Sequence, residues 1–349
     1  MLVTEHNNSQ FVFFHNFIAK AVLEAAACGD VDLLKTIIGG NENSKDPLYW
    51  ATQTDKKGRT PFHIGVISNK LSVVRFIANE IKTNSTIIDA TYFDVPDNKG
   101  RTPLFSSSAL GFFDITKFLI HRGCNIDAKT NGFHPAPGST PLMAAAEKGH
   151  QKCFAALMDS NGDIFAQRSD GADALYLAAR EGRKEIIEMI VNTDNIKIVC
   201  RDIINRPTYR NRTAIFTAAF HGYLEVGKLL FEHGALLDLQ DKDDFTPLIL
   251  AAHEGHLEFV QWLHRTGGVS IYKTDKFGDT ALDTSEINGH VETMKYLTSF
   301  VMIDYEHQRE SRKVPIFSKT YKFKKICEAH ATEFQKMKDI SKVITIWKS

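Results

Sequence analysis

Apolar and polar positions along this chain follow a pattern that predicts pairs of short helices. After Gly222, for example, apolar residues stand at Leu224, Val226, Leu229 and Leu230, which is the spacing of a helix with one buried face. A short phrase that begins with Thr and ends near a Gly precedes many of these stretches. Each unit is therefore predicted to be a helix, a turn, a second helix and a loop.

The phrase that opens each unit has the features of a helix start and a helix end. TPLMAAAEKGH at 140–150 returns almost unchanged as TPLILAAHEGH at 246–256. A Thr hydroxyl can accept a hydrogen bond from an N–H group of the first turn, and Pro suits the first helical position. The paired Ala residues allow a neighbouring helix to approach closely, and a left-handed Gly ends the helix. The predicted helix-ending glycines are Gly149, Gly182, Gly222 and Gly255.

Copies of the phrase recur along most of the chain. Successive starts lie 33 to 42 residues apart, so a 33-residue unit recurs with extra loop length at some junctions. Two short helices alone bury too little surface to offset the ordering of the backbone, which costs about 1 to 2 kcal/mol per residue. Stacked copies share one continuous core and can hold together. The eight predicted starts are Lys20, Thr60, Thr102, Thr140, Asp173, Thr213, Thr246 and Thr280.

These features resemble the ankyrin-repeat family over about residues 20–300. The T-P-L-x-x-A-A phrase, the 33-residue period, Gly-His pairs and the lead-ins DKKGRT and DNKGRT carry the resemblance. It implies an all-α solenoid of stacked helix-turn-helix units. His63 alone has the His that the family often carries after T-P-L. The resemblance does not imply the conformation of the long junctions, which are 39–59, 79–101, 124–139 and 191–212.

Segments on either side of the repeats are predicted to be helical caps. Residues 1–19 contain the apolar stretch FVFFHNFI, which would cover the exposed end of the first copy. Residues 301–349 are basic, with 11 Lys and Arg against 6 Asp and Glu, and 323–347 has apolar residues along one helical face. A cap helix is the simpler interpretation of that face. The alternative is a helix that binds a partner or an anionic membrane, and membrane contact is expected only there.

Charge and cysteine content narrow the function classes. The chain of 349 residues has 42 basic and 42 acidic side chains, so no overall field favours nucleic acid as the main partner. Five widely spaced cysteines without a C-x-x-C pair indicate reduced thiols and predict a cytoplasmic protein. The start MLVTEHNNSQ lacks the features of a secretion signal, and no apolar run is long enough to predict a membrane span.

Motifs for catalysis, cofactors or metals are not convincing in this sequence. GYLEVGKL at 222–229 has the spacing of a phosphate loop, but Leu229 stands where Ser or Thr is required. HEGH at 253–256 has its two histidines three residues apart, one fewer than in the H-E-x-x-H zinc motif, and the Gly-His pair of the repeat already accounts for His256. We therefore predict no enzyme activity, no cofactor, no metal and no small-molecule substrate. The opposing hypothesis is an active site hidden in 301–349 or in the long junctions.

With no chemistry predicted, function is expected on a surface. The resemblance implies a concave surface formed by the loop tips before each unit and the exposed edge of each first helix. Arg and aromatic residues dominate most interfaces, although each side chain alone is also compatible with a solvated loop. The predicted partner-binding residues are Lys56, Arg59, Lys99, Arg101, Lys148, Arg180, Tyr209, Arg210, Arg212, Phe220, His221, Phe245, His253 and Phe277.

The leading functional prediction is a non-catalytic scaffold that binds a partner protein on this surface. The alternative is an adaptor or secreted effector of an intracellular microbe that acts on host proteins in the host cytosol, with 301–349 recruiting a membrane or a partner. The sequence does not identify the partner, because one scaffold serves unrelated targets.

Overall fold

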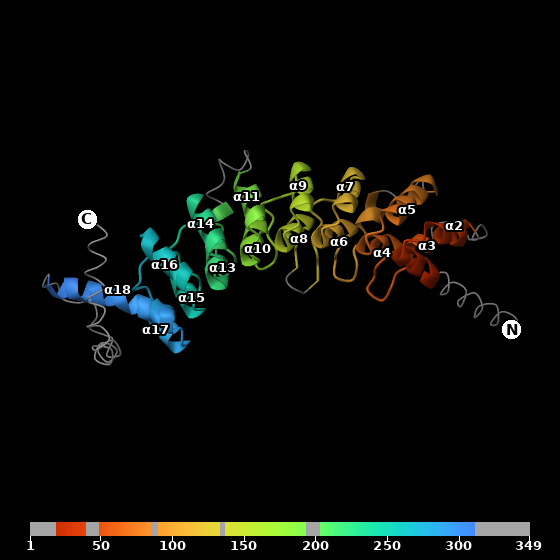
Figure 1. Ribbon diagram of the computed structural model, residues 1–349. Helices are drawn as coiled ribbons and strands as arrows, with labels where there is room; N and C mark the ends of the chain where they lie inside the picture. Colours follow the sequence, from red (N-terminus) through yellow and green to blue (C-terminus); the bar gives the residue numbers. More distant parts are fainter. Residues whose placement is uncertain (1–18, 40–48, 85–89, 133–136, 193–202, 311–349) are drawn as a thin grey trace, which may run out of the picture. The chain divides into compact units, whose positions relative to one another are not determined.

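The computed structural model describes residues 19–39, 49–84, 90–132, 137–192 and 203–310; for 82–84, 90–91 and 302–310 it describes the backbone only. The chain divides into two compact units, 1–294 and 295–349. Every regular element in the described ranges is a helix, as predicted (Figure 1). The predicted caps at 11–18 and 323–347 lie outside these ranges. No helix within them is both long and apolar enough to cross a membrane.

The first helices of successive repeats form one layer of unit 1–294. Each packs against the first helix of the next repeat, from α4 to α17 (Figure 1). The paired alanines at 145–146, 178–179, 218–219 and 251–252 are fully buried, which allows this close packing. The layer consists of α4 (Pro61–Ile67), α6 (Pro103–Leu110), α8 (Pro141–Lys148), α10 (Ala174–Arg180), α13 (Ala214–His221), α15 (Pro247–His253) and α17 (Ala281–Ile287).

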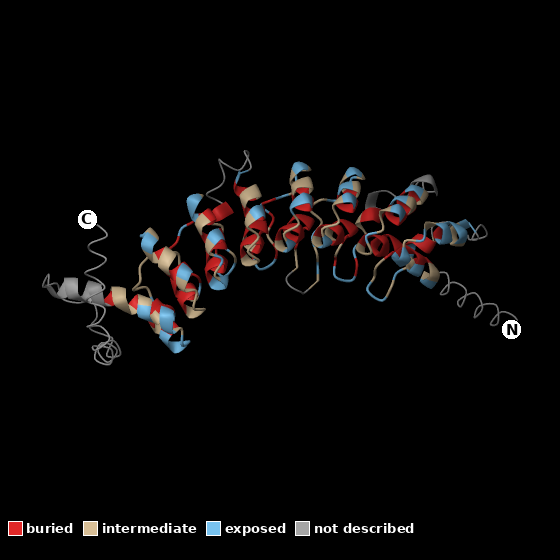
Figure 2. Ribbon diagram, in the orientation of Figure 1, coloured by how far each residue is buried: buried red, intermediate tan, exposed pale blue. Residues whose placement is uncertain are grey.

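The second helices form the other layer, and each packs against its own first helix and against the neighbouring second helices. Large apolar side chains such as Phe154, Phe216 and Phe259 are fully buried, and buried residues line both layers where they face each other (Figure 2). The second layer consists of α5 (Leu71–Asn84), α7 (Phe113–His121), α9 (Gln151–Asp159), α11 (Lys184–Asn192), α14 (Leu224–Glu232) and α16 (Leu257–Thr266). Helix α18 (Val291–Glu310) follows α17 in the sequence.

Short helices occupy parts of the junctions at the N-terminal end. Residues 19–28 are helical and precede α2 (Val31–Gly39), which packs against α5. Helix α3 (Tyr49–Thr52) packs against α4, and the 3₁₀ helix η1 (Ala90–Asp94) packs against α6. The hydroxyl of Tyr92 in η1 donates a 2.8 Å hydrogen bond to the carbonyl of Ala51 in α3. The junctions 39–59 and 79–101 are thus joined through these two short helices.

The threonine caps expected from the T-P-L phrase form at Thr140 and Thr246. The hydroxyls of Thr140 and Thr246 accept bonds of 3.3 and 3.1 Å from the N–H groups of Met143 and Ile249. Thr213 differs, because its hydroxyl is buried and has no hydrogen-bond partner among the described residues. A threonine at the start of a unit therefore does not always form a side-chain cap.

His63 forms a reciprocal cap with Thr60 and joins two repeats. Its backbone N–H donates to the Thr60 hydroxyl, and its Nδ1 accepts from the Thr60 N–H at 3.3 Å. Its Nε2 lies 3.3 Å from the carbonyl of Arg101 in the next repeat. Burial lowers the pKa of His63 to about 4, so the ring is neutral at pH 7.

The predicted helix-ending glycines have left-handed backbone and also make room for the next repeat. Gly149, Gly182, Gly222 and Gly255 have φ of 77°, 66°, 71° and 76°. The ring of His256 lies 2.5 Å from where a Cβ on Gly222 would stand, and its Nε2 is 3.0 Å from the Phe220 carbonyl. His150 bonds the Ala109 carbonyl in the same way, at 3.1 Å. The Gly-His pair is therefore a link between repeats.

Candidate partner-binding surface

The loops before the first helices are tied to one another through their backbones. In most pairs of neighbouring repeats, a carbonyl near the tip of one loop accepts a hydrogen bond from an N–H group of the next loop. Because these bonds use main-chain atoms, they hold the tips in fixed order whatever the side chains are. Examples are Asn98 to Lys57 at 2.9 Å, Tyr209 to Asp170 at 3.0 Å, Lys242 to Arg210 at 3.0 Å and Lys276 to Asp243 at 3.1 Å.

Arg59 and Arg101 stabilise their own loops. The carboxylate of Asp97 accepts hydrogen bonds from the backbone N–H of Lys99 and Arg101, at 2.9 Å each, and from Arg101 Nε at 2.8 Å. Burial alone would raise the pKa of Asp97, but these hydrogen bonds and the charge of Arg101 lower it. Asp55 binds Arg59 in the same way, with a 2.7 Å bond to Nε. The two arginines predicted to contact a partner are thus engaged within the loops.

Further along the chain, ion pairs connect one loop with the next. Arg212 Nε lies 2.7 Å from the carboxylate of Asp241, whose side chain is buried. Asp243 receives Lys276 at 2.8 Å and Arg210 at 3.8 Å. The hydrogen bond from Lys276 lowers the pKa of Asp243. Arg212 therefore has a structural role, whereas the side chain of Arg210 is 73% exposed and accessible to a partner.

Two predicted residues at the ends of first helices belong to a small ion-pair network. Lys148 lies 3.0 Å from Glu147, and Arg180 of the next repeat lies 3.5 Å from the same carboxylate. Arg180 also contacts Glu181 at 3.1 Å. These charges are partly exposed, so each pair contributes little stability and remains available for exchange with a partner's charges.

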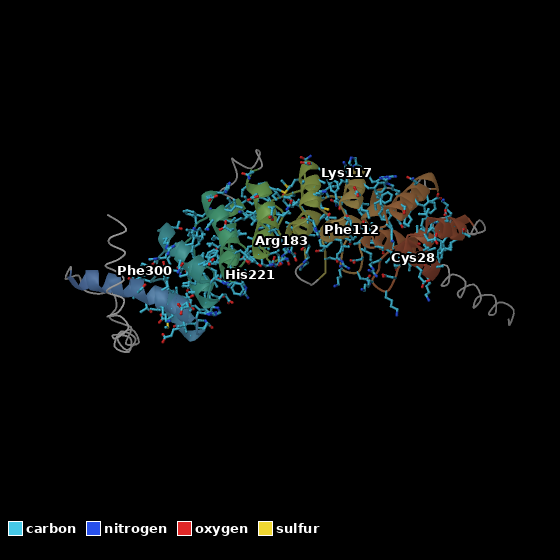
Figure 3. All side chains as sticks on the ribbon, in the orientation of Figure 1. Cys28, Phe112, Lys117, Arg183, His221 and Phe300 are labelled. Atoms are coloured by element: carbon cyan, nitrogen blue, oxygen red, sulfur yellow. The ribbon has the colours of Figure 1, made fainter. Side chains whose placement is uncertain are left out.

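Aromatic and histidine side chains gather at the ends of α13 and α15. The rings of Phe220 and His221 meet edge to face at 5.0 Å, and His221 stacks on Tyr223 at 5.7 Å. All three are exposed, Phe220 and Tyr223 by 38% each, and Figure 3 labels His221 on this part of the molecule. Burial lowers the pKa of His221, which keeps it neutral at pH 7. We call Phe220, His221 and Tyr223 the aromatic cluster.

Phe245 and His253 extend the aromatic character toward the next repeat. Their rings meet edge to face at 6.5 Å, and His253 Nδ1 lies 2.8 Å from a carboxylate oxygen of Glu254. At the loop tips, Tyr209 is 63% exposed and Phe277 is 73% exposed, with Lys276 Nζ 5.1 Å from the Phe277 ring centroid. The predicted residues thus reach the surface of several neighbouring repeats. That they bind a partner stays a prediction.

Tyr223 was not among the residues predicted from the sequence. It follows Gly222, at the position that holds His in the Gly-His pairs, and its ring lies 3.1 Å from where a Cβ on Gly182 would stand. The sequence pattern accounts for it as a link between repeats. The available signal was its place two residues after His221, which makes three ring side chains within residues 220–223.

The buried thiols in the described residues are not activated. Burial raises the pKa of Cys124 to about 12 and also raises the pKa of Cys153. A cysteine nucleophile needs the opposite shift. Within the described ranges, no group of three or more His, Cys, Asp or Glu side chains is arranged to hold a metal ion. The absence of enzyme activity, of cofactors and of a small-molecule substrate stays a prediction.

Comparison with protein families identifies the repeats. The model described as ankyrin repeats (3 copies) matches residues 22–130, 130–202, 162–243, 197–275 and 215–309. The chain belongs to the ankyrin-repeat family. Ankyrin repeats generally mediate protein–protein interactions, and the family is typically non-catalytic. The ankyrin repeats of this chain therefore imply a protein partner.

Curated proteins with different names match parts of this chain. The B-cell lymphoma 3 protein homolog of Mus musculus is 27% identical over 65% of this chain and 48% of its own length. The ankyrin repeat and KH domain-containing protein mask-1 of Caenorhabditis elegans is 26% identical over 58% of this chain and 8% of its own length. The glycerophosphocholine phosphodiesterase GDE1 of Candida albicans is 25% identical over 64% and 19%, respectively. The chain matches less than half the length of each of these relatives.

Proposed function

We propose that this ankyrin-repeat chain is a non-catalytic scaffold that binds a partner protein on the surface formed by its loop tips and the ends of its first helices. The observation that carries the proposal is the exposed aromatic cluster, which lies on elements tied together by buried helix packing. Exposed aromatic side chains cost free energy in water, and they supply much of the binding energy where they become covered.

The fixed arrangement of the loops supports this proposal. Tyr209 and Phe277 project from tips that backbone hydrogen bonds join to the neighbouring loops. A partner that covers these rings therefore meets groups already held in place, which reduces the ordering cost of association. The ion pairs of Lys148 and Arg180 lie on nearby repeats and would form a polar rim around the aromatic centre.

Three broader predictions accompany this proposal. We propose a cytoplasmic location, and we keep the alternative that the chain is a microbial adaptor or effector in the host cytosol. We assign any membrane contact to residues 301–349 alone. None of these affects the surface that is proposed to bind.

The test is photo-crosslinked capture of a partner from a eukaryotic cell lysate. We expect the Phe220→Ala/Tyr223→Ala variant to lose a crosslinked product that the wild-type chain forms. The matched control is Phe231→Ala, because Phe231 is 41% exposed but lies on α14, in the second layer. Capture that survives the double change but fails in the control would place the binding surface elsewhere. Capture that needs residues 301–349 alone would also refute the proposal.

A further inference from the structure

Two neighbouring loops near the N-terminal end present positive charge that the described residues do not neutralise. Lys56 and Lys57 stand at the tip of loop 55–59, and Lys99 stands at the tip of loop 97–101. All three side chains are exposed. Among the described residues, the carboxylates nearest in the sequence are bound to Arg59 and Arg101, and none forms an ion pair with these lysines.

The remaining charges of these loops cancel one another. Asp55 binds Arg59 and Asp97 binds Arg101 within each loop. The hydrogen bonds that lower the pKa of Asp55 and Asp97 keep both carboxylates ionised and committed to these arginines. Each Asp–Arg pair is neutral as a unit, so the lysines alone set the charge that the tips present.

The first helices behind these loops bring no competing charge. Helices α4 and α6 contain no Asp, Glu, Lys or Arg. The one titratable ring there, His63, is buried and neutral at pH 7. By contrast, α8 ends in Glu147 and Lys148, which pair with each other. No carboxylate of α4 or α6 therefore offsets the charge of the three lysines.

The C-terminal loops show the opposite arrangement. Arg212 is paired with Asp241, and Lys276 is paired with Asp243 across neighbouring loops. Lys242 is exposed without an ion pair among the described residues, but its loop also holds Asp241, Asp243 and Asp244. Net positive charge is thus concentrated at the N-terminal end of the row of tips. The backbone bond from Asn98 to the Lys57 carbonyl, 2.9 Å long, keeps the two lysine-bearing tips adjacent. The lysines of both loops can therefore act on one ligand.

From this arrangement we infer that the tips of loops 55–59 and 97–101 bind an acidic segment of the partner protein, with Lys56, Lys57 and Lys99 as the recognising residues. The inference rests on the proposed function and specifies the charge of the partner. A polypeptide suits these tips better than nucleic acid, because they carry no aromatic side chain on which a base stacks. The balance of 42 basic and 42 acidic residues also gives no general attraction for polyanions.

Fluorescence anisotropy with the full chain tests the inference. The probe is a labelled peptide of alternating Glu and Ser, and the control peptide has Gln in place of Glu. We expect the Glu peptide to bind, and to bind less tightly as salt rises from about 0.05 M to about 0.3 M. The Lys57→Glu/Lys99→Glu variant should weaken this binding by about tenfold, because two attractions become repulsions.

A matched variant separates local recognition from net charge. Lys117 and Lys152 are exposed on α7 and α9 of the second layer, so Lys117→Glu/Lys152→Glu makes the same change in net charge away from the tips. We expect this variant to bind the Glu peptide within about twofold of wild type. Equal weakening in both variants would overturn the inference. Tighter binding of a single-stranded oligonucleotide through the same lysines would also overturn it, in favour of a nucleic-acid ligand.

Failure of the acidic-segment inference can be distinguished from failure of the proposed scaffold function. If the aromatic double variant abolishes partner capture while Lys57→Glu/Lys99→Glu changes neither capture nor peptide binding, the scaffold function stands and the acidic-segment inference fails. If the peptide binds as expected but no surface variant alters capture, the tips recognise acidic segments and the aromatic surface is not the binding site.

Discussion

Asp173 stands at a helix start where most other copies have Thr, and it is a buried carboxyl. Its side chain accepts a 2.9 Å hydrogen bond from the Tyr176 N–H. Burial raises the pKa of Asp173 from 3.8 to about 6. The folded state therefore keeps its proton to higher pH than the unfolded state does. Stability from this group is present at low pH and is lost as pH rises from about 4 to about 6.

Replacing Asp173 by Asn removes the titration and keeps an acceptor for the helix start. We expect Asp173→Asn to be more stable than wild type at pH 7.5 by about 3 kcal/mol, since a pKa shift of one unit corresponds to about 1.4 kcal/mol. The difference should shrink toward pH 4. Urea unfolding at several pH values measures it. Parallel curves for the two proteins would show that Asp173 does not titrate as proposed.

The stability that depends on His63 changes with pH in the opposite direction from that of Asp173. The pKa of His63 falls from 6.5 to about 4 on folding, so the unfolded state takes up a proton first as the pH falls. Stability is then lost between about pH 6.5 and pH 4. The His63→Gln variant keeps the reciprocal cap with Thr60 but has no proton to gain. We expect it to lose less stability than wild type, by about 3 kcal/mol, when acidified over that range; thermal unfolding followed by circular dichroism would reveal this. An unchanged acid dependence would contradict it.

Single residues also show which structural features the sequence predicts and which it does not. The phrase T-P-L predicted the caps of Thr140 and Thr246 because a helix start depends on neighbours within four residues. It could not show that the Thr213 hydroxyl is left without a partner, or that Arg212 binds Asp241 on the next loop. Those facts depend on how two repeats meet, and a one-dimensional pattern does not contain that geometry.

Among the elements, the turns and loops that border the helices contain glycines constrained by left-handed backbone, by contact with the next repeat, or by both. Gly222, in the turn between α13 and α14, and Gly278, in the loop before α17, both have left-handed backbone, with φ of 71° and 84°. The His256 ring occupies the space beside Gly222, whereas nothing lies within 4 Å of where a Cβ on Gly278 would stand. Substitutions at these two glycines therefore separate the cost of backbone strain from the cost of a clash with the next repeat.

We expect Gly278→Ala to cost about 1 kcal/mol from backbone strain alone. Gly222→Ala should cost clearly more, because the His256 ring must also move and lose its bond to the Phe220 carbonyl. Urea unfolding of both variants gives the comparison. In the Gly222→Ala/His256→Ala double variant, part of the excess should disappear, as expected for residues in contact. If the two substitutions lower the free energy of unfolding equally, the His256 ring moves aside without a loss of stability.

The short helices of the long junctions were also not predictable from the sequence, because they too depend on contacts with other segments. Helix α3 and η1 have no apolar period of their own, since each is only four or five residues long. They are held by contacts with other segments, such as the bond from Tyr92 to Ala51. The long periodic helices, in contrast, were predictable because their buried face recurs in every copy.

For the molecule as a whole, packing is mainly between neighbours. Within unit 1–294, each first helix packs chiefly against the adjacent first helices and its own second helix. Stability in such an arrangement is close to a sum of unit and interface terms. A change in one repeat should therefore weaken its surroundings more than distant repeats.

Ala251→Leu tests this directly, because Ala251 is fully buried in α15, which packs between α13 and α17. We expect a loss of about 1 to 3 kcal/mol from overpacking. Amide hydrogen exchange should accelerate in α13, α15 and α17 and change little in α4 and α6. Uniform acceleration along residues 61–287 would show that the repeats unfold as a single block instead.

The bonds between loop tips have a consequence for how such a chain changes over generations. They join main-chain atoms, as from Lys242 to the Arg210 carbonyl, so replacing the tip side chains leaves them in place. Mutation can therefore change the side chains at the tips while the backbone framework that holds them stays intact. The same freedom would let a designer randomise residues 56, 57, 99, 209 and 277 together and still recover a folded protein.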